Sequence, residues 1–452
     1  MDTTQKIPGP RPRLFRGNLP EFRQDRLGFL THCARTYGDV FQLRLGPRWI
    51  TVFCHPDQIE EVLVTKNHNF RKHFALRVNP IVLGNGLLTS EGDFWLRQRR
   101  LSQPAFLKQR ITQYGDIMVH FAQRMLDGWH DGQHCEVLDE MMKLTLGIIA
   151  KTLFGADIAD KAREVGDALR VAQDQFLRRV GTLLPMPLWV PTPGNIRLHR
   201  AVRKLDAIIY EFIRQRRANT ADKGDVLSLL LQARDEGDRT GMTDQQLRDE
   251  AMTLFLAGHE TTALTLAWAW YLLAVNPDAA AKLGAEVDGV VGARAVTVAD
   301  WPRLAFTERV MLETMRLYPA AYIVGREALH DCVIGGHPVS KGRTVLMPQW
   351  IVHRDSRWYV EPERFLPERW EGEAAKRLPK FAYFPFGGGP RQCIGNTFAM
   401  METVLVLATI AQQYDFTVVP DHPVIPWPTF TLRPLHGIKA TLRIRKRPEH
   451  VA

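Results

Sequence analysis

A long apolar run crosses the middle of this chain from Ala251 to Val275. Thr243, followed three residues later by Gln246, is typical of a helix start, and Asn276-Pro277 would end the helix. The pattern therefore predicts one helix over 243–275, about 50 Å long at 1.5 Å per residue and buried on all sides. A membrane span is the rival interpretation, but His259 and Glu260 at the centre of the run would make it costly.

Towards its two ends the chain changes to short alternating strands and turns. Val40 to Leu45 alternates between the two faces of a strand, and Gly46-Pro47 turns the chain into a second strand. We expect a β-rich part from residues of about 39–64, 327–346 and 429–445, and a helical part at about 92–325 and 396–415. No repeat or linker divides the chain, so residues 1–452 are expected to form a single domain, mainly α with a smaller β-rich part (α+β).

Composition narrows the class of protein. Hydrophobic residues make up 45% of the chain and charged residues 24%, as in ordinary globular proteins. The five cysteines lack the C-x-x-C spacing of zinc and iron–sulfur sites, and scattered thiols favour a reducing compartment over a disulfide framework. The net charge of +10 is spread along the chain without a recognition motif, which excludes a nucleic-acid partner and favours an acidic protein partner.

The most informative segment for chemistry is 386–395, Phe-Gly-Gly-Gly-Pro-Arg-Gln-Cys-Ile-Gly, which contains Cys393. Its glycines allow the backbone to pass close to a flat ligand. Arg391 adds a nearby positive charge that favours the anionic form of a thiol. A lone cysteine is more often a small buried hydrophobe, but such a residue would have no use for these neighbours.

The pattern FxxGxRxCxG in this segment resembles the haem-binding loop of the cytochromes P450 and matches it at every fixed position. The resemblance implies that Cys393 is the metal ligand, as the axial thiolate of the iron of haem b (iron protoporphyrin IX), a ligation that favours O–O cleavage. It also implies that Phe386 and Arg391 contact this cofactor. One thiolate is too few for a zinc or iron–sulfur site and enough for haem.

Further cofactor contacts follow from the same resemblance. Trp95-Leu-Arg-Gln-Arg99 matches the family pattern WxxxR, so Trp95 and Arg99 are candidates to bind the haem propionates. Arg326 lies seven residues after Pro319, where the family often has another such arginine. Gln98 stands where many relatives have histidine, and no role is assigned to it.

Residues 257–262, Ala-Gly-His-Glu-Thr-Thr, resemble the oxygen-activation motif AGxET of the same family. By this resemblance Ala257 and Gly258 lie against the cofactor, Thr261 assists the activation of O2, and Glu260 relays protons with ordered water. His259 fills the variable position and is expected to face away from the iron. Taken alone, the segment would be a bent core helix with satisfied polar groups.

Two more segments resemble family motifs with a structural role. Glu313-Thr-Met-Arg316 matches ExxR, and the stretch 365–370 matches FxPER[FW] and contains Arg369. The resemblance implies that Glu313, Arg316 and Arg369 form a buried network that fixes the cysteine loop. His353 lies in another familiar segment and is expected to be structural.

Substrate contacts are the least defined part of the sequence. The segments that line the pocket in relatives correspond to 77–88, 176–189, 255–257, 320–324 and 430–432. They are mostly apolar, with Tyr322 and Thr431 as candidate polar anchors, which favours a lipophilic molecule such as a fatty acid or terpenoid.

The resemblance covers nearly the whole chain and implies a haem-thiolate monooxygenase that inserts one oxygen atom of O2 into such a molecule. Electrons are expected from a ferredoxin or flavodoxin with its reductase, because no fused electron-transfer domain is recognisable. The basic residues expected to receive this partner are Arg97, Arg100, Lys108, Arg110, Lys376, Arg377 and Lys380.

The protein is expected to be a cytoplasmic, bacterial monomer, since no membrane anchor precedes the proline-rich start of the chain. Three alternatives remain open. They are a peroxygenase of the same fold, an isomerase of the same fold, and a non-catalytic haem-thiolate sensor.

Overall fold

The computed structural model describes residues 7–77, 80–157, 162–180, 186–218, 223–235, 237 and 239–445. Contacts within the chain divide it into two compact units, each assembled from segments that are far apart in sequence. The first, called here the sheet unit, comprises 1–78, 315–393 and 428–432. The second, called the helical unit, comprises 79–314, 394–427 and 433–452.

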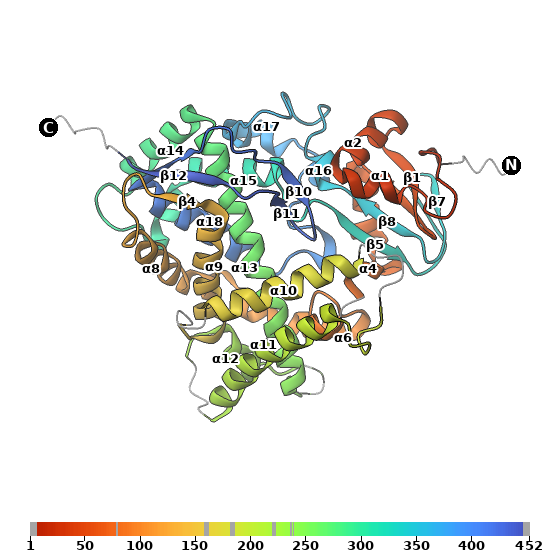
Figure 1. Cartoon of the computed structure of the whole chain (residues 1–452), viewed down its shortest axis with the longest axis horizontal. Coiled ribbons are helices and arrows are strands. Elements are labelled where there is room, and N and C mark those ends of the chain that lie inside the picture. Colours follow the sequence, from red (N-terminus) through yellow and green to blue (C-terminus); the bar gives the residue numbers. More distant parts are fainter. Residues whose placement is uncertain are drawn as a thin grey trace. The chain divides into compact units, whose positions relative to one another are not determined.

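The sheet unit is built on a five-stranded sheet in the order β1-β2-β8-β5-β3 (Figure 1). Strands β1 and β2 form the predicted hairpin, and Gly46 makes the turn at φ +60°. Strand β8 pairs parallel with β2, and β5 is antiparallel to both β8 and β3. The strand bounds are β1 Val40–Leu45, β2 Arg48–Phe53, β3 Phe70–Lys72, β5 Val324–Ala328 and β8 Thr344–Met347.

Short helices and a second hairpin complete the sheet unit. Its buried core joins the apolar face of the sheet to Phe381 and Phe384, which lie shortly before the cysteine segment. The core therefore anchors the chain that leads into Cys393. The remaining bounds are α1 Leu19–Gln24, α2 Arg26–Tyr37, α3 Pro56–Glu60, α4 Phe74–Arg77, β6 Cys332–Ile334, β7 His337–Val339, α16 Gln349–Val352 and α17 Gly372–Lys376.

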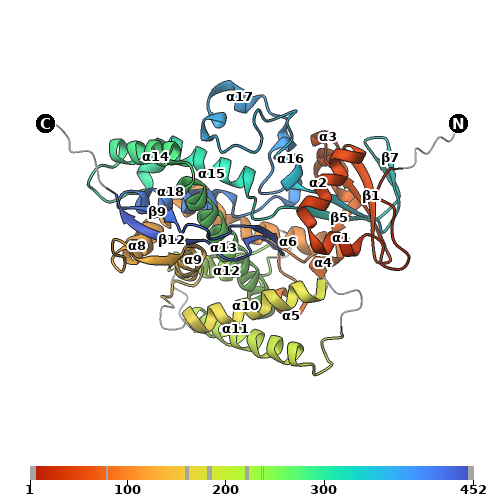
Figure 2. The same ribbon diagram turned by 45° about the horizontal axis from the view of Figure 1, so that its top comes forward.

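The helical unit is organised around α13, which packs along α9, while α10 and α11 lie side by side in both views (Figures 1 and 2). Helix α15 begins in this unit and ends in the sheet unit. The helix bounds are α5 Pro80–Leu83, α6 Gly92–Ser102, α7 Lys108–Gln113, α8 Gly115–Leu126, α9 Val137–Phe154, α10 Ala162–Val180, α11 Pro193–Ala218, α12 Val226–Gln232, α13 Asp244–Ala274, α14 Pro277–Val290, α15 Ala305–Leu317 and α18 Asn396–Ala411.

Helix α13 confirms the prediction for the apolar run. Thr243 caps it, and the reciprocal bonds between Thr243 and Gln246 form the expected capping box. Trp268 and Trp270 are among the largest fully buried side chains, and the Trp270 ring packs 4.5 Å from that of Phe416. Among the described residues, no helix is long and apolar enough to cross a membrane.

The mainly α class with a smaller β-rich part is confirmed. Four strands lie outside the ranges expected to be β-rich, namely β3, β4, β9 and β10. Strands β4 His134–Glu136 and β9 Tyr414–Val418 pair with the two edges of β12 Lys439–Ile444. β10 Pro426–Pro428 pairs with β11 Leu432–Pro434. Such short strands are stabilised by partners distant in sequence, so local periodicity does not reveal them.

Candidate active site

The segment around Cys393 forms a tight turn. The N–H of Cys393 donates to the carbonyl oxygen of Phe386, and that of Gln392 donates to Gly389, each over 3.0 Å. Gly389 has φ +67°, and a Cβ at this position would lie 1.8 Å from the carbonyl oxygen of Leu63. The turn therefore requires glycine at 389 for its conformation and for the close approach of another backbone.

Cys393 differs from the other cysteines in its accessibility. Its side chain is exposed, whereas Cys33 and Cys54 are buried and Cys135 and Cys332 are partly buried. Burial raises the pKa of Cys33 to about 11 and that of Cys135 to about 12, and it also raises the pKa values of Cys54 and Cys332. Those four thiols stay protonated at neutral pH, so Cys393 is the sulfur available to a metal.

The donor set also fits a cofactor bound through one sulfur. Within the described part of the chain, no group of three or more His, Cys, Asp or Glu side chains is arranged to hold a metal ion. An accessible thiol on a glycine turn fits a flat metal-bearing cofactor. It does not fit a zinc or iron–sulfur centre, which needs several thiolates.

The backbone of Phe384 is held on both sides just before this turn. Its N–H donates to Nε2 of His353 over 3.0 Å, and its carbonyl accepts from the side-chain amide of Gln349 over 2.5 Å. Burial, with the nearby Arg316 as a smaller cause, lowers the pKa of His353 to about 3. His353 is therefore a neutral acceptor with the structural role that the sequence suggested.

Arg316 ties together the irregular stretch that precedes the cysteine turn. Its side chain is fully buried, and its guanidinium donates to three carbonyl oxygens: His353 at 2.8 Å, Pro362 at 2.6 Å and Arg364 at 3.1 Å. The guanidinium of Arg369 donates to the same carbonyl of Arg364 over 3.4 Å. The two arginines thus converge on one backbone segment, and Glu313, the third residue of the expected network, is fully buried on α15.

Tyr359 connects this arginine pair to the lead-in of the turn. The Arg316 guanidinium lies 4.9 Å from the centre of the Tyr359 ring and that of Arg369 lies 5.9 Å from it. The Tyr359 hydroxyl donates to the carbonyl oxygen of Ala382 over 2.9 Å. Tyr359 was not recognised from the sequence, because its role depends on contacts that no local pattern encodes.

The other predicted cofactor contacts of the sheet unit lie in two places. Phe386 and Arg391 are partly buried within the cysteine turn itself. Arg326 is buried in β5, and its Nη1 donates to the neighbouring carbonyl of Gly325 over 2.9 Å.

In the helical unit, the middle of α13 carries a strip of accessible residues in an otherwise buried helix. Ala257 is exposed, and Leu256, Gly258 and Thr261 are partly exposed. The Thr261 hydroxyl donates to the carbonyl oxygen of Ala257 over 2.6 Å, within the helix. These positions include the predicted contacts Ala257 and Gly258 and the predicted catalytic alcohol.

Gly258 of this strip and the adjacent His259 pack against α9. A Cβ on Gly258 would lie 2.9 Å from the end of the Ile149 side chain, so helix packing accounts for this glycine. His259 is buried, and its Nε2 lies 3.0 Å from the carbonyl oxygen of Met142. Burial lowers the pKa of His259 to about 4, which keeps the imidazole neutral.

Glu260 is buried and forms an ion pair with Arg433 of β11. The Arg433 Nε lies 2.6 Å from Oε1 of Glu260, and Nη2 of the same guanidinium also contacts that oxygen. No local pattern indicates this partner, because the two residues lie far apart along the chain.

Trp95 and Arg99 lie one turn apart on α6, and both are partly buried. Gln98 between them is fully buried, and its side-chain amide donates to the carboxylate of Glu250 on α13 over 3.0 Å. Gln98 is thus part of the framework that holds α6, although the sequence assigned it no role.

Three consecutive charged residues of α13 bind the chain segment 81–87. Arg248 donates to the carbonyl oxygen of Val82 over 3.0 Å. Asp249 accepts from the N–H of Asn85 over 2.9 Å, and Glu250 accepts from the N–H of Leu87 over 3.0 Å. Three consecutive charged residues in a mostly apolar helix can be recognised in the sequence, but no role was predicted for them.

Glu250 should make folding stability fall with rising pH. Burial raises the pKa of its carboxyl to about 7, above about 4.3 in an unfolded chain. Between these values the folded state keeps a proton that the unfolded state has lost. Stability contributed by this group is therefore complete below about pH 4 and is lost as the pH rises to about 7, by roughly 3 kcal/mol.

Unfolding free energies of the wild type and of Glu250→Gln, measured across this pH range, should show a flatter dependence in the variant. Glu373→Gln, which changes an exposed glutamate, should keep the wild-type slope. Equal slopes in Glu250→Gln and the wild type would contradict the assignment.

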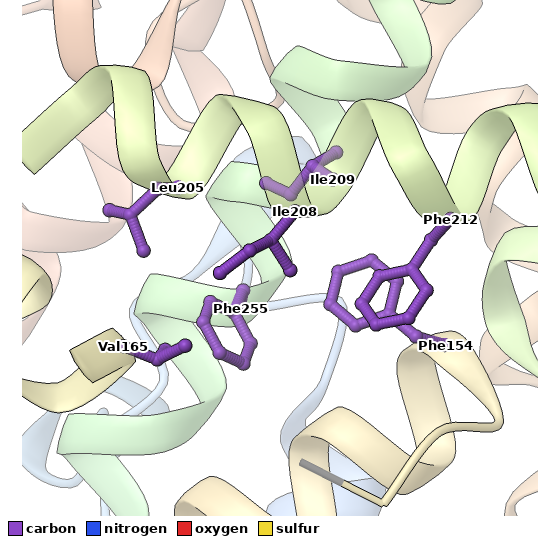
Figure 3. A pocket seen from close by; sticks show the side chains of 7 residues that line it. All are labelled: Phe154, Val165, Leu205, Ile208, Ile209, Phe212 and Phe255. Atoms are coloured by element: carbon purple, nitrogen blue, oxygen red, sulfur yellow. The ribbon is translucent and has the colours of Figure 1, made fainter. Parts of the chain in front are cut away.

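Phe255, expected to line a substrate pocket, instead packs among α9, α10 and α11 (Figure 3). Its ring lies 5.8 Å from that of Phe154, which stacks on Phe212 at 4.7 Å. The apolar cavity that these side chains leave measures about 10 Å³, room for about one water molecule. It is too small for a lipophilic substrate.

The candidate polar anchors are also engaged. The Tyr322 hydroxyl donates to the carbonyl oxygen of Thr429 over 2.8 Å and accepts from Arg26, and both Tyr322 and Thr431 are buried. Tyr322 is therefore a structural residue in the sheet unit. Of the other expected lining segments, residues 78–79 and 181–185 lie outside the described residues.

Two of the basic residues expected to receive a redox partner make polar contacts within the chain. Arg97 donates to the hydroxyl of Thr240 over 2.7 Å, and Lys376 pairs with Glu373 over 2.7 Å. Arg100, Lys108, Arg377 and Lys380 have exposed side chains, and Arg110 is partly buried.

These features fit a class of protein that binds a flat metal cofactor through a single cysteine thiolate. Comparison with known proteins gives the family. The cytochrome P450 family model matches residues 7–439. The chain belongs to the cytochrome P450 family; it is a haem-thiolate monooxygenase with haem b as its cofactor.

Several relatives align over most of both chains. Cyclooctatin synthase of Streptomyces melanosporofaciens is 39% identical, covering 88% of this chain and 87% of the relative. Cyclooctat-9-en-7-ol 5-monooxygenase of the same organism is 35% identical, with coverages of 92% and 90%. Pentalenene oxygenase of Streptomyces avermitilis is 33% identical, covering 91% of each chain.

Proposed function

We propose that this chain oxidises a terpenoid. One oxygen atom of O2 enters a C–H or C=C bond of the substrate, and two electrons and two protons reduce the other atom to water. The observation that carries this function is the accessible Cys393 thiol on its glycine turn, in a chain of this family. The names of the relatives, which refer to cyclooctatin, cyclooctat-9-en-7-ol and pentalenene, support the substrate class.

Haem supplies the binding and activation of O2, and the protein supplies ligation, orientation and protons. In this proposal Cys393 ligates the iron, and Phe386 and Arg391 of the same turn contact the cofactor. The guanidinium groups of Arg99, Arg326 and Arg391 and the indole N–H of Trp95 bind the propionates. Arginine suits this task because its planar fork matches a carboxylate.

Ala257 and Gly258 lie against the cofactor in this proposal, and their accessibility in mid-helix supports it. Thr261 holds a hydroxyl at an accessible position, where it can donate a hydrogen bond during oxygen activation. Glu260 relays protons towards it, with water completing the path. Because positioned proton transfer contributes roughly 10²–10⁴-fold to a rate, these two residues should have a large effect on product formation.

The same proposal includes the electron donor and the state of the protein. A ferredoxin or flavodoxin with its reductase delivers the electrons, and the exposed Arg100, Lys108 and Lys380 with the net charge of +10 support an acidic partner. The protein works as a cytoplasmic monomer, and residues 1–452 act as one catalytic domain.

The deciding experiment is a binding and turnover panel on the haem-loaded protein. Terpenes, terpene alcohols, fatty acids, steroids and macrolides are added in turn, and the change in the haem absorption spectrum gives the affinity. We expect the tightest binding and coupled product formation with terpenoids when NAD(P)H and a ferredoxin or flavodoxin system supply electrons.

Each arm of the panel separates one alternative. Product from hydrogen peroxide at the same rate as from the reductase system would indicate a peroxygenase, and ligand binding without turnover would indicate a sensor. Conversion without consumption of reductant would indicate an isomerase. Preference for fatty acids over all terpenoids would contradict the substrate class.

A further inference from the structure

Arg433 is a charged residue at the oxygen-activation motif that the sequence did not predict. Its guanidinium contacts one carboxylate oxygen of Glu260 through two nitrogens, Nε at 2.6 Å and Nη2. The Glu260 side chain is 5% exposed and that of Arg433 is 24% exposed. The carboxylate is thus removed from water while its cationic partner keeps limited access to solvent.

His259 and Thr261, which flank Glu260 in α13, show what surrounds its carboxylate. His259 is bound to the Met142 carbonyl, and burial together with the positive charge of Arg433 lowers the pKa of its imidazole. His259 therefore stays neutral and adds no second positive charge beside the carboxylate. On the other side, the Thr261 hydroxyl donates to Ala257 within the helix.

The acid and the alcohol of the motif are therefore both engaged in this structure. A buried carboxylate held by two N–H donors is stabilised as an anion and is restricted in orientation. For Glu260 to pass a proton towards the accessible strip, this contact has to loosen or the carboxylate has to turn. The strength of the Arg433 contact then determines how readily Glu260 takes part.

We propose that Arg433 is a positioning residue for proton delivery: it holds the Glu260 carboxylate charged and oriented, and the opening of this pair controls transfer through Glu260. This inference rests on the proposed function of Glu260 as a proton relay. Arg433 acts through Glu260 and takes no part in contacting the substrate.

The energetic coupling between Arg433 and Glu260 is measured first, by a method that needs no catalytic turnover. Arg433→Met and Glu260→Gln are made singly and together, and the folding equilibrium of the haem-loaded proteins is measured by denaturant. Because the two charges stabilise each other, the effects of the single substitutions should not simply multiply. The equilibrium constant for folding of the double variant should be about tenfold higher than the product of the two single effects predicts. Additive effects would overturn the assignment of Arg433.

The functional readout is the pH dependence of the fraction of reductant recovered in product. Arg433→Met should shift this profile and lower the fraction recovered, and Arg433→Lys, which keeps a cation, should restore much of it. Once Glu260 is already Gln, adding Arg433→Met should change nothing further. Arg443→Met removes a guanidinium from an exposed position in β12 and should leave the profile unchanged.

The relay function of Glu260 and the positioning role of Arg433 would be contradicted by different results. A wild-type profile in Glu260→Gln, with coupled unfolding in the double-mutant cycle, would overturn the relay function of Glu260 and the role of Arg433 with it. A wild-type profile in Arg433→Met, with a changed profile in Glu260→Gln, would overturn the positioning role alone. If Arg433→Met does not fold, Arg433→Lys decides: an ammonium replaces the two nitrogen contacts of the guanidinium with one, so its profile should depart measurably from that of Arg443→Met, and a profile equal to that of Arg443→Met would contradict the proposal.

Discussion

Replacing Arg316 by methionine is expected to abolish stable haem incorporation. The substitution removes the donors for the carbonyl oxygens of His353, Pro362 and Arg364, all within a fully buried environment. Each buried carbonyl oxygen left without its donor costs about 1–3 kcal/mol, so three of them amount to a large part of the stability of a typical domain. The irregular stretch before the cysteine turn should then lose its fixed path.

The variant should be recovered as colourless or poorly pigmented protein with a lower unfolding temperature. Haem content per protein and thermal unfolding measure the two effects. Arg316→Lys should rescue little, because an ammonium cannot present a planar fork to three carbonyls. Arg309→Met, earlier on the same helix α15 and not fully buried, is the matched control and should keep its haem. A normally pigmented and stable Arg316→Met protein would contradict the network.

The sequence predicted the elements whose signals are local. The capping box at Thr243 and the proline at 277 bound the buried helix α13 to within one residue at each end. The Gly46 turn and the alternation on either side of it predicted the first hairpin. The strands β4 and β9 were missed because each is held by pairing with β12 rather than by its own sequence.

The residues of the candidate site also fall into two groups, those with a local signal in the sequence and those without one. Motif residues such as Cys393 and Thr261 could be proposed from the resemblance of their segments to family motifs, because each motif lies within one short stretch of the chain. The residues that hold them could not: Tyr359, Gln98 and Arg433 act through contacts with segments distant in sequence. The packing of Phe255 among α9, α10 and α11 could likewise not be predicted, because its position in the apolar run does not show which helices cover it.

Thr261→Ala should leave the fold and the haem intact while most of the reductant is lost as hydrogen peroxide. The Thr261 hydroxyl bonds only a carbonyl of its own helix among the contacts described here, and alanine is a good helix former, so little stability should be lost. Product per NAD(P)H should fall by about tenfold or more, since a positioned proton donor is worth roughly 10²–10⁴-fold. Product, peroxide and NAD(P)H consumption are measured together.

Helix α13 offers its own control one turn further on. The Thr265 hydroxyl donates to the carbonyl oxygen of Thr261 over 2.8 Å, the same bond to the fourth preceding residue that Thr261 makes. Thr265 is buried, however, whereas Thr261 belongs to the accessible strip. Thr265→Ala should therefore keep wild-type coupling, and Thr261→Ser, which retains the hydroxyl, should keep most of it. If Thr261→Ala alone wastes reductant, the effect comes from the accessible hydroxyl, as expected. If both alanine variants waste reductant equally, the effect comes from losing a hydrogen bond within the helix, and the prediction is contradicted.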